Sequence, residues 1–187
     1  MMTMLRSSLI RFGYLLASTI LLAACNKNSS NPAEDTDHAA VTTAILQFKQ
    51  GGVVKFEYGF DDPDGIGGNA PTRFDKIVLD KGQTYTVDLV LQNKTGGSTK
   101  DMTASIRSAG KYHEFFYLPQ GFSMNITKDD KDELGFPLGL QSTWVSSAAP
   151  ASGVLRFTLQ HLLVKKPVNQ PTDGHSDIAI DFPIEIK

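Results

Sequence analysis

From residue 41 onward, apolar side chains recur at every second position of short runs, and this spacing constrains the fold more than any other feature of the chain. Strand side chains alternate between two faces, whereas helical faces repeat every 3.6 residues. The clearest run is 84–92, where four apolar side chains share one face: Tyr85, Val87, Leu89 and Leu91. The same reasoning predicts strands over 41–48, 53–60, 74–79, 84–92, 114–118, 122–127, 138–145, 153–164 and 177–186.

The segments that connect these predicted strands favour a single antiparallel domain. They are rich in Gly, Pro, Asn and Asp, which suit hairpins and short loops. No amphipathic segment of about 10–15 residues separates the runs, which argues against a doubly wound α/β fold. We predict an all-β domain over 41–187, an antiparallel immunoglobulin-like β-sandwich of about eight or nine strands. One short helical turn is expected near 101–109, ahead of Gly110.

Alternation also assigns faces in the last two predicted strands. In 153–164 the inward face carries His161 and Leu163 in register with Leu155, Phe157 and Leu159. In 177–186 the inward residues begin at Ile178, so Asp177 is expected on the outward, polar face.

The first 24 residues have a basic and then an apolar part. Arg6 and Arg11 precede an apolar stretch, 12–24, which contains no acidic residue and is too short to span a bilayer comfortably. This layout is typical of a secretory signal peptide. The stretch ends in Leu-Ala-Ala-Cys, which resembles the lipobox of bacterial lipoproteins, and Cys25 is the single cysteine of the chain. We therefore predict a signal peptide over 1–24, lipidation of Cys25 and attachment to the membrane through the lipid.

The next segment, 25–40, is predicted to be a flexible tether. After Cys25 it contains no aliphatic or aromatic side chain larger than alanine, so it cannot bury enough surface to offset the entropy of ordering. The expected location is the cell envelope, at the outer membrane of a Gram-negative bacterium.

Charge and cysteine content exclude several classes of partner and site. With 18 Lys+Arg against 20 Asp+Glu the net charge is −2, and nucleic acid is not an expected partner. One cysteine permits neither an internal disulfide nor a multi-thiolate metal cluster.

Two groups of residues are candidate metal ligands. The loop after the second predicted strand offers hard oxygen ligands for calcium: Asp61, Asp62, Asp64 and Asn69. The alternative interpretation is an Asp- and Gly-rich turn. Separately, His113, His161 and His175 would form a site if they met at one end of the sandwich, although an inward histidine is more often a hydrogen-bonded core residue.

Signs of catalysis are few. No G-x-S-x-G nucleophile motif occurs, and the carboxylates in 129–133 are predicted to form a solvated, mixed-charge turn. Trp144 and the tyrosines suit a binding face or the core of the sandwich. We therefore do not expect an enzyme and keep a hydrolase only as the last alternative.

Besides the lipobox, the chain has three distinctive motifs: F-D-D-P-D-G-I-G-G-N-A-P from Phe60, H-E-F-F-Y from His113 and the ending D-I-A-I-D-F-P-I-E-I. Together these motifs resemble a family of small bacterial envelope lipoproteins. Some members are catalogued as type 1 periplasmic binding fold superfamily proteins, a label that implies a sugar- or amino-acid-binding α/β protein. The strand periodicity predicts an all-β domain instead, and the resemblance implies no activity.

Three functional hypotheses follow. The first is a lipid-anchored, non-enzymatic binding or accessory module of the cell envelope, with an envelope protein such as an outer-membrane transporter as its partner. The second is a metal-binding lipoprotein, with calcium in the 61–69 loop or a metal at the histidines. The third is a hydrolase.

Overall fold

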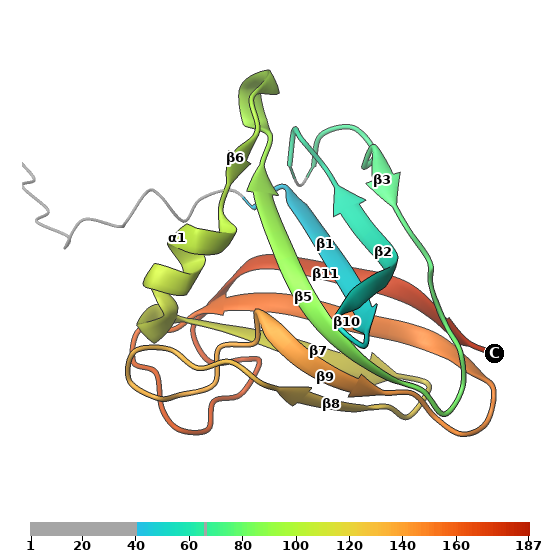
Figure 1. Ribbon diagram of the computed structural model, residues 1–187. Helices are drawn as coiled ribbons and strands as arrows, with labels where there is room; N and C mark the ends of the chain where they lie inside the picture. Colours follow the sequence, from blue (N-terminus) through green and yellow to red (C-terminus); the bar gives the residue numbers. More distant parts are fainter. Residues whose placement is uncertain (1–40, 66) are drawn as a thin grey trace, which may run out of the picture. The chain divides into compact units, whose positions relative to one another are not determined.

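The computed structural model describes residues 41–65 and 67–187, which form two β-sheets packed face to face (Figure 1). The prediction of an all-β sandwich with one short helical turn is confirmed. The predicted signal peptide, Cys25 and the tether over 25–40 lie outside the described residues. Among the residues described, no helix has the length and apolar character needed to cross a membrane.

The larger sheet has seven strands, and all neighbouring pairs are antiparallel. Its order is β3-β2-β1-β5-β9-β8, and β6 pairs with β5. The bounds are β1 Thr43–Gln50, β2 Val53–Asp61, β3 Arg73–Phe74, β5 Thr84–Asn93, β6 Lys100–Asp101, β8 Asn125–Lys128 and β9 Gln141–Val145.

The smaller sheet has four strands in the order β4-β11-β10-β7. Its long strands are antiparallel, whereas β4 runs parallel to the end of β11. The bounds are β4 Ile77–Leu79, β7 His113–Gln120, β10 Ala151–His161 and β11 His175–Ile186.

The run 74–79, predicted as one strand, is divided between the two sheets. Phe74 pairs with Phe60 in the larger sheet, whereas Ile77 pairs with Ile184 in the smaller one. The chain crosses at Asp75, whose carboxylate accepts hydrogen bonds from the Gly59 amide at 2.8 Å and from Arg73 Nε at 2.7 Å. These bonds satisfy the polar groups at the crossing.

The predicted helical turn is α1, Thr103–Ser108, which buries Ile106 and leads into the 3₁₀ turn η3, Gly110–Tyr112. A second 3₁₀ turn, η2, covers Thr95–Gly97. Because η3 ends where β7 begins, α1 lies beside the end of the smaller sheet from which β7 starts (Figure 1).

Trp144 belongs to the core and not to a binding face. Its ring is fully buried between the sheets, edge-to-face with Phe48 at 5.1 Å and with Tyr117 at 5.3 Å between ring centroids. The indole Nε1 donates to Ser142 Oγ at 2.7 Å, so its polar atom is satisfied inside the protein.

The last two predicted strands need correction at the ends where they adjoin. β10 stops at His161, and Leu163, predicted to face inward, is 84% exposed. Residues 162–174 form the loop that joins β10 to β11. Leu163, Val164 and Val168 are exposed on this loop, because the sheet has ended and no neighbouring strand remains to cover them.

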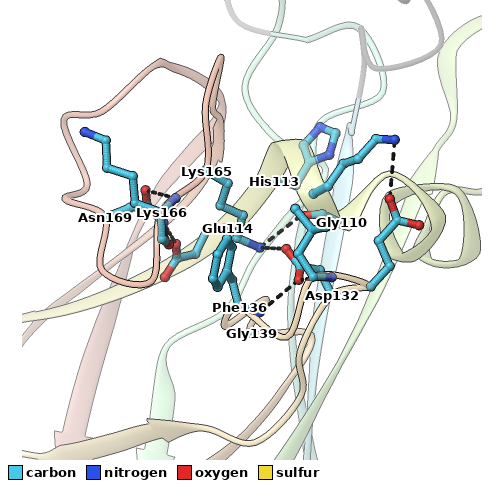
Figure 2. A network of polar contacts seen from close by, with 12 residues as sticks. Gly110, His113, Glu114, Asp132, Phe136, Gly139, Lys165, Lys166 and Asn169 are labelled. Carbon is cyan, nitrogen blue, oxygen red and sulfur yellow. Dashed lines mark hydrogen bonds and ion pairs between the residues drawn. The ribbon is translucent and has the colours of Figure 1, made fainter.

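The prediction that the 129–133 segment is solvated holds for Asp129, Lys131 and Glu133, which are exposed, but is wrong for Asp130 and for the side chain of Asp132. Asp132 is the partner of a buried lysine in the 162–174 loop. Lys165 Nζ lies 2.9 Å from Asp132 Oδ2, with both side chains fully buried, and donates to the Gly110 carbonyl at 2.9 Å (Figure 2). Asp132 Oδ1 also accepts the amide of Phe136 at 2.9 Å. Asp130, likewise buried, accepts the amide of Gly139 at 2.7 Å.

A second contact holds the same loop. Asn169 Nδ2 donates to Glu114 Oε2 at 2.7 Å, and Glu114 also pairs with Lys128 (Figure 2). The 162–174 loop is therefore fixed at Lys165 and at Asn169, which flank the exposed Val168, whereas the exposed Leu163 and Val164 come before Lys165.

Candidate metal centre

Three of the four histidines lie in one row across the smaller sheet. His113, the first residue of β7, pairs with His161, the last of β10, and His161 pairs with His175, the first of β11. Directly paired residues of antiparallel strands project from the same face of a sheet. The row therefore places three imidazoles together at one end of the smaller sheet, as the sequence suggested.

A β-bulge adds a carboxylate to this row. Leu159 pairs with Ile178, but the next residue of β10, Gln160, pairs with Ser176, which leaves Asp177 as an extra residue in β11. A bulge breaks the strict alternation of a strand and can turn a side chain to the other face. The prediction that Asp177 faces outward is therefore wrong, because the bulge turns its carboxylate toward the histidines.

The ligand atoms of His113, His161 and Asp177 all lie within 4.8 Å of one another, and this is the one such group of three within 41–65 and 67–187. Ligands arranged tetrahedrally at about 2.0–2.2 Å from an ion stand roughly 3.3–3.6 Å apart. Small side-chain rotations would therefore bring these three atoms onto one ion. His113 Nε2 already lies 3.4 Å from Asp177 Oδ2.

The orientation of His113 is set by α1. Its ring is completely buried, and its Nδ1 lies 2.9 Å from the Ala109 carbonyl oxygen at the end of the helix. Because a carbonyl can only accept, Nδ1 carries the proton, and in the neutral ring the Nε2 lone pair then faces Asp177. Metal-binding histidines usually have this kind of support from the second ring nitrogen.

His161 is positioned by neighbouring rings. Its imidazole makes an edge contact with His113 and a stacked contact with His175, each at 4.9 Å between centroids, and stacks with Tyr112 at 6.1 Å. These contacts limit the rotation of the ring and keep it beside the other two ligands.

The donor set determines which ions fit. Two imidazole nitrogens and one carboxylate oxygen suit Zn²⁺ or Cu²⁺, whereas Ca²⁺ takes six to eight oxygen ligands. With both imidazoles neutral, the carboxylate is the one charge among the three ligands, and it favours a cation at their centre.

The predicted calcium ligands are not brought together in this way. Asp61 accepts a hydrogen bond from Thr43 Oγ1 at 2.6 Å and pairs with Lys94 Nζ at 2.7 Å. Burial would raise the pKa of Asp61, but the bonds from Lys94 and Thr43 outweigh it and hold this pKa below its usual value. The carboxylate is thus ionised and already neutralised by a lysine.

The other loop residues bind one another. Asp64 Oδ2 accepts both the backbone amide of Asn69, at 2.8 Å, and its side-chain amide, at 2.7 Å. Asp62 is buried, and its pKa is raised by burial first and then by Asp64 beside it. This arrangement favours the interpretation of the loop as a hydrogen-bonded turn.

Comparison with protein-family models, with curated proteins and with solved structures finds no match. The function is therefore argued from the geometry of the site.

Asp177 is the candidate metal ligand that sequence reasoning missed. Its neighbours Ile178 and Ile180 fit a regular strand, and nothing in the local sequence marks an extra residue. The one sequence feature that could have pointed to Asp177 is the polar segment His175-Ser176-Asp177, which begins a strand whose other inward positions are all apolar.

Proposed function

We propose that this protein is a lipid-anchored, metal-binding protein of the bacterial cell envelope, which binds Zn²⁺ or Cu²⁺ through His113, His161 and Asp177. It acts by binding and not by catalysis, and an envelope protein that receives or supplies the ion is its partner.

The observation that carries the proposal is the convergence of three ligand atoms from three adjacent strands within 4.8 Å. Two further features support it. A helix-end carbonyl orients the buried His113, and the carboxylate of Asp177 is placed in the group by a bulge that interrupts the ladder.

Zn²⁺ titration of the purified chain tests the metal site. A Cys25→Ser background removes the thiol as a competing ligand. We expect one Zn²⁺ per chain, and we expect Asp177→Asn and His161→Gln to weaken binding by about 100-fold or more. This expectation follows because losing even an outer-shell partner costs about 10–100-fold. Affinity is measured by competition with a chromogenic chelator.

His38→Gln is the matched control, because it removes a histidine outside the described residues. It should leave the affinity unchanged, and circular dichroism should show that all variants stay folded. Equal affinity in the control and in both site variants would contradict the proposal.

The membrane anchor is tested separately. We propose that Cys25 receives the lipid, and its support is the Leu-Ala-Ala-Cys sequence after an apolar, arginine-preceded stretch. In cells fed a labelled fatty acid, the wild-type chain should carry the label and sediment with membranes, whereas Cys25→Ser should lose the label. Equal labelling of both would show that Cys25 is not the lipidated residue.

A further inference from the structure

We infer that His175 is a fourth, exchangeable ligand of this metal site, which closes it from the solvent side and through which the ion enters and leaves. The inference rests on the proposed function, because it concerns the same site, and it adds the path of ion exchange. It is carried by the position of His175 relative to Asp177 and by its exposure.

The carboxylate of Asp177 lies between a buried and an exposed histidine. Its Oδ2 lies 3.4 Å from His113 Nε2, and its Oδ1 lies 3.4 Å from His175 Nε2. The two oxygens belong to one carboxylate, so an ion bound beside Asp177 is within a short side-chain rotation of His175. The ligand atom of His175 is thus adjacent to the site without being part of the three-residue group.

The two histidines on either side of Asp177 differ sharply in freedom. The His113 side chain is completely buried, whereas that of His175 is 67% exposed. The backbone of His175 is nevertheless fixed, because it pairs with His161 in the ladder. In the structure its ring is stacked on that of His161. The imidazole of His175 can therefore swing toward the ion or away from it while its Cα stays in place.

Gly174 supports this arrangement. It has a φ of +73°, a conformation in which a side chain is strained, and a Cβ there would lie 1.9 Å from the His161 carbonyl oxygen. The glycine thus lets the chain re-enter the sheet directly against His161, which sets His175 opposite it. Sites that hold zinc permanently are closed by four protein ligands, whereas sites that exchange a ligand keep one position open to solvent. With the imidazole of His175 bound, the site has four protein ligands and is closed; with this imidazole swung away, it has three ligands and one position open to solvent.

The experiment compares His175→Ala with the wild-type chain in the Cys25→Ser background, using Zn²⁺ and Co²⁺ as probes. We expect His175→Ala still to bind one Zn²⁺, but roughly 10- to 100-fold more weakly. Release to excess chelator should be faster by a similar factor, because affinity changes at one site act mostly on dissociation. The visible spectrum of bound Co²⁺ should shift, because water replaces an imidazole nitrogen.

Ser176→Ala is the control, since Ser176 pairs with Gln160 on the opposite face of the sheet. It should leave the affinity, the release rate and the Co²⁺ spectrum unchanged. If His175→Ala also matches the wild type in all three while Asp177→Asn loses binding, His175 is not a ligand and the proposed metal site stands. If His175→Ala binds no Zn²⁺, His175 is a core ligand and not the exchangeable one. If the wild type binds no Zn²⁺ or Co²⁺, the proposed function itself fails.

Discussion

Lys165→Met is expected to lower the free energy of unfolding by about 3–5 kcal/mol, the usual cost of removing one partner from a buried ion pair. Methionine has a similar length but no charge, so Asp132 would stay buried without its cation and the Gly110 carbonyl would lose its donor. Chemical denaturation of wild type and variant, followed by tryptophan fluorescence of Trp144, measures the difference.

Lys166→Met is the matched control, because this neighbouring lysine is exposed. Its expected effect lies within about 0.5 kcal/mol. Similar unfolding midpoints for the two variants would show that the Lys165–Asp132 pair contributes no net stability.

The pH dependence has a definite sign. Burial alone would raise the pKa of Asp132, but the hydrogen bond from Lys165 and the amide bonds outweigh it and hold this pKa below its usual value. The stabilisation is therefore complete above about pH 4, the ordinary range of an aspartate, and is lost as pH falls through the lowered pKa. The stability difference between wild type and Lys165→Met should accordingly shrink on acidification.

Trp144→Ala should also destabilise the fold, by about 3–5 kcal/mol, as is typical when a large buried aromatic residue is truncated. The substitution leaves a cavity between the sheets, removes the edge contacts to Phe48 and Tyr117, and deprives Ser142 Oγ of its indole donor. Urea denaturation followed by far-ultraviolet circular dichroism measures the loss, because the variant has no tryptophan to report it.

Val145→Ala is the control, because it shows whether any truncation in β9 lowers the free energy of unfolding as much as the loss of the buried Trp144 side chain does. Val145 adjoins Trp144 but is 39% exposed, so Val145→Ala should lower the free energy of unfolding much less, by about 1 kcal/mol or below. Trp144→Phe should fall between the two. Equal effects of Trp144→Ala and Val145→Ala would contradict the assignment of Trp144 to the centre of the core.

Local periodicity was sufficient to predict the β fold. Each of the nine predicted runs overlaps at least one strand, because burial of one face imposes a two-residue period that is visible in the sequence. Local periodicity did not predict where a strand ends or which sheet it joins, because pairing with distant strands decides both. The run 74–79 divides between two sheets at Asp75, and Leu163 follows the apolar pattern of β10 although the sheet ends at His161.

The candidate site could be predicted only in part, because alternation within one strand is visible in the sequence whereas pairing between strands is not. His161 shares a face with the apolar side chains of its predicted strand, and alternation alone placed it inward. Asp177 was missed because a bulge is defined by the partner strand, and no single-strand pattern contains that information. The burial of Asp132 within the 129–133 turn was missed similarly, since the lysine that pairs with it comes from a distant loop.

The extra residue in β11 also divides that strand into two lengths with independent registers. From Ile178 onward, pairing with β10 fixes the apolar core, whereas His175 and Ser176 are paired after the shift. A one-residue deletion at the bulge would move only this short end and would leave the core pairing as it is. The sheet can therefore acquire, lose or change the polar side chains at this end during evolution without having to find a new packing for its interior.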